Sequence, residues 1–243
     1  MIIKYDYITC KPRRDREIYM SNSSLDFLNM IKNGADRKPA PAPRSKTVQT
    51  PVHKPATLAS MIAVIDTETN WRDEVMSIGV ALADTESYKC SDKLYYIFDP
   101  ECRVGGMFSG VLSHGDIKGI RTGRKNAMDQ IKKSLTDKAV AKIFAYNGRF
   151  DLSHLPELGG FEWYDIMRVA AYKQFNKAIP DSLPCCKTGR LKTNYGVEPI
   201  LRILSRENRY CEIHNAVYDA MDELRIMELL KLPLSDYEVA KIN

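Results

Sequence analysis

Met61-Ile-Ala-Val-Ile-Asp66-Thr-Glu68-Thr-Asn70 is the stretch of sequence that decides the fold. It begins with five apolar residues and ends in polar ones, which is typical of a buried strand that runs out to the edge of a sheet. Alternation along a strand places Asp66 and Glu68 on one face, two residues apart. Neighbouring carboxylates repel each other unless a cation neutralises them, and hard oxygen ligands favour Mg²⁺ or Mn²⁺. The stretch therefore predicts a strand over residues 61–67 that carries metal ligands.

Two later stretches also carry polar groups at the ends of regular elements. Ile143-Phe-Ala-Tyr-Asn147-Gly-Arg-Phe150-Asp151 runs from an apolar strand into a carboxylate, and His214-Asn-Ala-Val-Tyr-Asp219 opens the clearest helical pattern in the chain. Taken alone, Asp151 fits an ordinary cap of a turn over residues 152–155, and His214 or Asp219 fits a helix cap. Because His214 precedes the helix and Asp219 lies on its first turns, both side chains can face one cleft.

Together the three stretches resemble the signature of the DEDDh 3′–5′ exonucleases, an RNase H-like family that includes the polymerase proofreading subunit. The family pattern is Asp-x-Glu, then Asn-x-x-Phe-Asp, then His-x-Ala-x-x-Asp-Ala, and all three occur here in that order within residues 61–232. The resemblance implies a hydrolase that releases nucleoside monophosphates from the 3′ ends of DNA or RNA. It implies two Mg²⁺ or Mn²⁺ ions and a histidine general base, whose ordinary pKa of about 6.5 suits that role. The implied metal ligands are Asp66, Glu68, Asp151 and Asp219, and the implied base is His214.

A second assignment of the last motif stays open. Tyr218-Asp-Ala-Met-Asp222 also fits the Tyr-x-x-x-Asp pattern of the sister DEDDy exonucleases, in which a tyrosine replaces the histidine. In that interpretation Asp222 would be the metal ligand and His214 would have no catalytic role. The His-x-Ala-x-x-Asp-Ala context favours the histidine form, and we then expect Asp222 and Glu223 on the solvent side of the helix.

Substrate contacts are expected in the loop after the first motif and around the second. Trp71 can stack on a base or pack against the domain, and Asn147 can hydrogen-bond the substrate or hold its own loop. Lys187, Arg190 and Lys192 can contact phosphates or lie in solvent. The residues expected to bind substrate are Thr67, Thr69, Trp71, Asn147 and Phe150.

The rest of the pattern after residue 58 predicts an α/β domain. Turn residues separate apolar runs over 61–67, 74–83 and 93–98, which favours an antiparallel meander. A buried strand is expected over 139–146, and Asp165 can cap a helix. Helical spacing covers 126–135, 166–173, 200–204 and 217–230. We therefore predict an RNase H-like mixed β-sheet flanked by helices.

The N-terminal quarter has a different composition. Residues 1–60 hold 11 of the 36 basic residues and 5 of the 31 acidic ones, so the whole net charge of +5 comes from this part. Five prolines between residues 39 and 55 indicate an extended linker. We predict a small basic segment over 1–35, a Pro-rich linker over 36–58 and the nuclease domain over 59–243. The basic segment is expected to recruit nucleic acid or a protein partner, and the alternative function is a nuclease-fold adaptor.

Composition also sets limits on compartment and chemistry. No apolar run approaches the ~20 residues that span a bilayer, so we expect a soluble, cytoplasmic protein without membrane contact. The chain has six cysteines and no CxxC pair, which favours reduced thiols over a zinc site.

Overall fold

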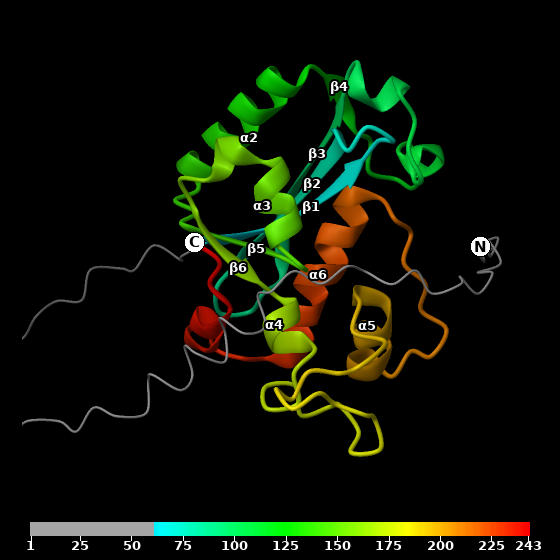
Figure 1. The fold of residues 1–243 in the computed structure, drawn as a ribbon. Coiled ribbons are helices and arrows are strands. Elements are labelled where there is room, and N and C mark those ends of the chain that lie inside the picture. Colours follow the sequence, from blue (N-terminus) through cyan, green and yellow to red (C-terminus); the bar gives the residue numbers. More distant parts are fainter. Residues whose placement is uncertain (1–60) are drawn as a thin grey trace, which may run out of the picture. The chain divides into compact units, whose positions relative to one another are not determined.

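The computed structural model describes residues 61–243, which form a six-stranded mixed sheet with helices on both faces (Figure 1). The strand order is β4–β3–β2–β1–β5–β6. The first three strands form the predicted antiparallel meander: β1 (Met61–Thr69), β2 (Val75–Asp84) and β3 (Cys90–Phe98). The predicted basic segment over 1–35 and the linker over 36–58 lie outside the described residues, so the division into domains stays a prediction.

Parallel pairing on the other side of β1 creates the edge on which the site is built. β5 (Lys142–Ala145) pairs with β1, and β6 (Glu162–Asp165) pairs with β5. The carboxyl ends of these three strands meet at one edge of the sheet, where α/β proteins commonly bind ligands. β4 (Ile120–Thr122) pairs in parallel with β3 at the far edge. The sequence did not predict β4 or β6, because three or four residues are too few to show a period.

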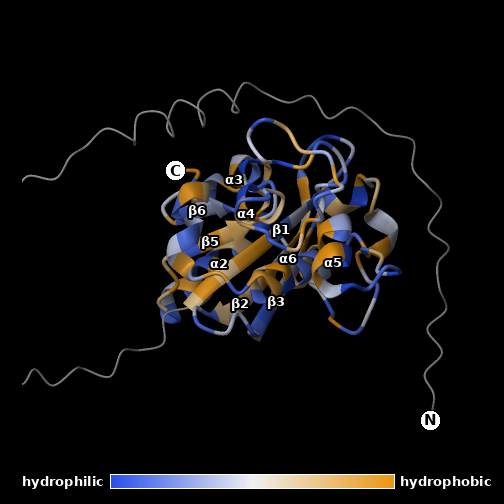
Figure 2. Ribbon diagram, turned by 90° about the horizontal axis from the view of Figure 1, so that it is seen from below, coloured by the Kyte–Doolittle hydropathy of each residue, from blue (hydrophilic) through white to orange (hydrophobic). Residues whose placement is uncertain are grey.

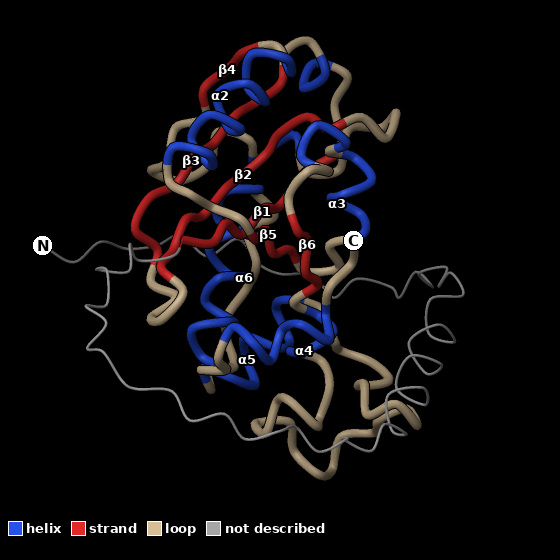
Figure 3. Tube along the Cα trace, turned by 90° about the vertical axis from the view of Figure 1, so that its left-hand side faces the viewer, coloured by secondary structure: helices blue, strands red, loops and turns tan. Residues whose placement is uncertain are grey.

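The helices cover the two faces of the sheet unequally. One face packs on α2 (Arg124–Asp137) and α3 (Arg149–His154); the other packs on α4 (Met167–Ala170), α5 (Val197–Ser205) and α6 (Ala216–Leu230) (Figure 3). Figure 2 shows hydrophobic residues along the strands and the helix sides that pack on them. The helix predicted over 166–173 is shorter, because a loop over 171–196 leaves the helix path and is closed by the bridge between Tyr172 and Arg190.

A close approach between α6 and β2 fixes the position of the helix start. A Cβ atom on Gly79 would lie 2.2 Å from the carbonyl carbon of Ala216, far inside van der Waals contact. Gly79 also pairs with Asp66 across the β1–β2 ladder. The missing side chain therefore lets the backbone of the first helical turn lie directly beside the acidic end of β1.

Two expectations from composition concern the described part of the chain. No helix between residues 61 and 243 is long and apolar enough to cross a membrane. The structure forms no disulfide among the five cysteines in this range, and Cys10 lies outside it.

Candidate active site

Asp66 and Glu68 point to the α6 face of the sheet. Strand alternation puts them on the same side as Ile62 and Val64, which pack in one cluster with Ala220 of α6. Glu68 is buried, and Asp66 Oδ2 is shielded from solvent with no hydrogen-bond partner among residues 61–243. The expected shared face of the two carboxylates is therefore observed.

The start of α6 brings the third motif to the same place. Asn215 caps the helix: its side chain accepts a hydrogen bond from Val217 N at 3.3 Å, and its Nδ2 donates to Val111 O at 2.7 Å. His214 has a φ of 60°, so the chain reverses just before the helix. Asp219 lies in the first turn, where the helix dipole favours a negative charge.

Asp151 reaches the site from α3, which follows the end of β5. It is 2% exposed, and its Oδ1 accepts a hydrogen bond from Thr67 Oγ1 at 2.7 Å. The turn before α3 contains Asn147 with a φ of 60°, and Asp165 Oδ1 accepts from Asn147 N at 2.9 Å. Asp165 Oδ1 also accepts from Met167 N at 3.0 Å at the start of α4, whose N-cap residue is Ile166 rather than the expected Asp165.

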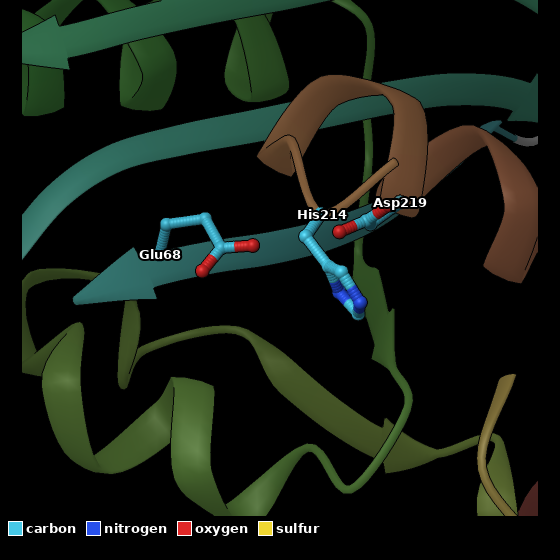
Figure 4. A group of neighbouring side chains, drawn as sticks. All are labelled: Glu68, His214 and Asp219. Atoms are coloured by element: carbon cyan, nitrogen blue, oxygen red, sulfur yellow. The ribbon is translucent and has the colours of Figure 1, made fainter. Parts of the chain in front are cut away.

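Three of the expected site residues form a group that could hold a metal ion, and Asp66 and Asp151 are not members of it. Glu68, His214 and Asp219 each offer a ligand atom within 4.8 Å of the other two (Figure 4). Asp219 Oδ1, like Asp66 Oδ2, is buried without a hydrogen-bond partner in the described part of the chain. Carboxylate oxygens without donors in a buried site are costly unless a cation binds them. The carboxylate oxygens of Glu68 and Asp219 therefore fit a hard divalent ion.

Burial raises the pKa of all four carboxyl groups, and the charges of neighbouring carboxylates add to the rise for Asp66, Glu68 and Asp219. Burial, followed by the charges of neighbouring carboxylates, raises the pKa of Asp66 well above its ordinary value. Burial and the charge of Glu212 raise the pKa of Glu68 to about 8 and that of Asp219 to about 9. Burial raises the pKa of Asp151 to about 7, although the Thr67 hydroxyl opposes the shift. Glu212, which the sequence analysis did not identify, is thus a further acidic neighbour of the site.

The expectation that Glu223 faces solvent is wrong. Glu223 is 2% exposed, and its Oε2 accepts a hydrogen bond from Tyr146 N at 2.9 Å. Burial, followed by the charges of Asp151 and Asp219, raises its pKa well above the ordinary value. The spacing of four residues from Asp219 places both on one face of the helix, and this was the signal in the sequence. Asp222 is half-buried rather than exposed, and its carboxylate accepts a hydrogen bond from the Tyr210 hydroxyl.

The tyrosine of the alternative motif has a different partner. The Tyr218 hydroxyl accepts hydrogen bonds from Asp116 N at 2.7 Å and from Ile117 N at 3.2 Å. This hydroxyl therefore holds the loop between β3 and β4. His214, not Tyr218, shares the acidic group with Glu68, which favours the histidine form.

The expected substrate-binding residues divide into exposed and buried ones. Trp71 is 68% exposed and Phe150 is 39% exposed, so packing of Trp71 into the domain is not observed. Asn147 is exposed and Thr69, at the end of β1, is partly buried. Thr67 is 6% exposed and its hydroxyl is bonded to Asp151 rather than to solvent.

Aromatic and basic groups complete the surroundings. The rings of Phe108 and His214 are stacked, with centroids 4.2 Å apart and an interplanar angle of 20°. In the loop between α4 and α5, the Arg190 guanidinium lies over the Tyr195 ring at 4.7 Å. Lys187 and Lys192 in the same loop are exposed, so their predicted phosphate contacts stay predictions.

Comparison with known proteins shows which solved structures share this fold. The sequence matches no protein-family model and no curated protein. The nuclease domain of 3′hExo, described as a DEDDh family member bound to rAMP, matches with a TM-score of 0.51 at 15% identity over 77% of this chain and 98% of that chain. A full-length 3′-exonuclease matches with a TM-score of 0.51 at 15% identity, over 75% and 85% of the two chains. This is the fold of the DEDDh 3′-exonucleases.

The DEDDh exonuclease fold confirms the predicted RNase H-like α/β architecture. E. coli exonuclease I in complex with an oligonucleotide also matches, with a TM-score of 0.50 at 15% identity over 73% of this chain. The match spans 41% of that exonuclease chain, and 64% of the chain of a 3′-exonuclease that recognises a histone mRNA stem-loop.

Proposed function

We propose that the protein is a metal-dependent 3′–5′ exonuclease that removes nucleoside monophosphates from the 3′ end of DNA or RNA. One observation carries the proposal: Glu68 of β1 and Asp219 of α6 lie in one group with His214, and the buried oxygens Asp66 Oδ2 and Asp219 Oδ1 have no donor in the described residues. The similar structures include one bound to rAMP and one in complex with an oligonucleotide, which supports nucleic acid as the substrate.

Two divalent ions, Mg²⁺ or Mn²⁺, would be held by four carboxylates, two of them in the group with His214 and two whose charges act on that group. When bound, such ions supply an activated water and neutralise the charge that develops on the phosphate. The carboxylates would bind them from three elements of a rigid core, which fixes their spacing before substrate arrives. The ligands are Asp66, Glu68, Asp151 and Asp219.

His214 is placed to act as the general base. It lies at the site edge beside Glu68 and Asp219, where it could take a proton from the attacking water. The stacked Phe108 ring and the chain reversal at His214 restrict how the imidazole can turn.

Exposed side chains next to the acidic group would bind the end of the strand. Trp71 and Phe150 can stack on unpaired bases, and such stacking contributes about 1–3 kcal/mol per base. The exposed Asn147 amide can hydrogen-bond the terminal nucleotide. Lys187 and Lys192 would contact phosphates further along the strand.

The test is cleavage of matched single- and double-stranded DNA and RNA oligonucleotides that carry a 5′ label. A 3′–5′ exonuclease gives a ladder that shortens from the 3′ end while the label is kept, and Asp66→Ala should abolish it without unfolding the protein. Internal cleavage, or undiminished cleavage in excess chelator, would contradict the proposal. Binding of the oligonucleotide without any cleavage would favour the adaptor function.

A further inference from the structure

Thr67 lies between two proposed metal ligands but faces away from them. Because side chains alternate along a strand, Thr67 points to the face of the sheet that packs on α2 and α3, opposite to Asp66 and Glu68. Its hydroxyl reaches Asp151 on α3, with Oγ1 2.7 Å from Oδ1, across a separation of 84 residues in sequence. Both side chains are buried.

We propose that Thr67 is a positioning residue, whose hydroxyl holds the Asp151 carboxylate in the orientation that binds a metal ion. The inference rests on the proposed function, because that function makes Asp151 a metal ligand. It replaces the expectation that Thr67 contacts the substrate. A threonine hydroxyl has a single hydrogen to donate, and here that hydrogen is used by Asp151.

Asp151 needs such a partner because its own element is short. α3 has six residues, and Asp151 lies in its first turn. Asp66 and Glu223 lie close to the same carboxylate, since the charge of Asp151 contributes to the raised pKa of both. A hydrogen bond to an ionised carboxylate is among the stronger kinds, and it commits one oxygen in a fixed direction. The second oxygen of Asp151 is then held in a defined position relative to β1.

The expected loss on removal of the Thr67 hydroxyl can be taken from other groups that hydrogen-bond to metal ligands. Removal of a group that orients a ligand commonly reduces metal affinity or activity by about 10–100-fold, while the ligand itself remains. A substrate contact would act differently, since its loss weakens binding of the nucleic acid rather than of the metal.

The chain offers a matched pair of variants at this position. Thr67→Val keeps the branched shape and removes the donor, whereas Thr67→Ser keeps the donor and removes a methyl group. We expect Thr67→Val to bind Mn²⁺ about 10–100-fold more weakly, measured by the electron paramagnetic resonance signal of free Mn²⁺, and Thr67→Ser to stay within about threefold of wild type. With a 5′-labelled oligonucleotide, Thr67→Val should need more Mg²⁺ for half-maximal rate and recover most of the rate at saturating Mg²⁺. Its KM for the oligonucleotide should not change.

A double-mutant cycle separates positioning from general damage. In the Asp151→Asn background, Thr67→Val should cause little further loss of Mn²⁺ affinity, because the carboxylate it orients is gone. Thr67→Ala is measured in parallel, so that poor folding of the valine variant leaves a second hydroxyl-free protein. The inference about Thr67 would be overturned, and the proposed function left standing, by a folded hydroxyl-free variant with wild-type Mn²⁺ affinity. A hydroxyl-free variant with a higher KM for the oligonucleotide and unchanged Mn²⁺ affinity would have the same consequence. Wild-type protein that neither binds Mn²⁺ nor cleaves would overturn the proposed function.

Discussion

Replacement of Glu223 by glutamine should make the metal-free protein more stable at neutral pH. Glutamine has nearly the same shape, and its carbonyl oxygen can accept the hydrogen bond from Tyr146 N that Glu223 Oε2 accepts at 2.9 Å. The change removes a buried acid whose pKa is raised well above 4.5 by burial and by the charges of neighbouring carboxylates. The variant therefore keeps the hydrogen bond from Tyr146 N and removes the loss of stability that comes from burying an ionisable group.

The magnitude follows from proton linkage. Below pH 4.5 the glutamic acid is protonated in both the folded and the unfolded chain, so the substitution gains nothing from ionisation. Above that pH the unfolded chain releases the proton and the folded chain retains it, which costs wild type about 1.4 kcal/mol per pH unit. Between pH 5.5 and pH 7.5, the advantage of Glu223→Gln should therefore grow by up to about 3 kcal/mol.

The assay is urea unfolding in EDTA at pH 5.5, 6.5 and 7.5 for wild type and three variants. Glu223→Ala should show the same change with pH but lie about 1–3 kcal/mol below Glu223→Gln throughout, because Tyr146 N loses its acceptor. Asp222→Asn is the matched control on the next position of the helix, and most of its change should be complete near pH 6, since burial raises the pKa of Asp222 to about 6. A stability difference between Glu223→Gln and wild type that stays constant from pH 5.5 to 7.5 would refute the reasoning.

Three other results are expected. In scanning fluorimetry, Mg²⁺ should raise the Tm of EDTA-treated protein more at pH 8 than at pH 5.5. The reason is that the pKa is raised to about 8 for Glu68 and about 9 for Asp219, so protons compete with the metal at low pH. Asp219→Asn should reduce the rise in Tm. His214→Ala should cleave about 10²–10⁴-fold more slowly and still bind Mn²⁺. Tyr218→Phe should keep most of its rate, because the Tyr218 hydroxyl accepts hydrogen bonds from two loop amides. The reverse ranking in single-turnover assays would assign the DEDDy mechanism. Trp71→Ala should raise the KM for single-stranded oligonucleotides by about 5–150-fold, the equivalent of 1–3 kcal/mol of stacking, and an unchanged KM would remove Trp71 from the binding surface.

The acidic end of β1 was predictable because the signal is local. A run of five apolar residues gives the strand, and the alternation gives the shared face of Asp66 and Glu68. The start of α6 was equally visible, since its apolar residues recur every three or four positions over 15 residues. Where a period extends over many residues, sequence and structure agree.

Features that depend on packing between distant segments could not be obtained in this way. Glu223 looks like a solvent-exposed helical residue until the contact with Tyr146 N, 77 residues away, is known. The hydroxyl of Thr67 has the same ambiguity, because a strand threonine beside a motif fits a substrate contact as well as a bond to a distant aspartate. In both cases the partner lies on an element whose position only the folded sheet defines.

The absence of a side chain at Gly79 affects the distances between the elements that carry the site residues. Because the backbone of Ala216 occupies the space that a Cβ atom would need, β2 and the start of α6 lie in direct backbone contact at this point. Gly79 also pairs with Asp66 on β1, so this backbone contact contributes to the distance between Asp66 and the carboxylate of Asp219 on α6. A methyl group at this position, 140 residues from Asp219, would spread the two halves of the acidic group apart. A residue that bears no functional group would therefore help to set the distance between the proposed metal ligands.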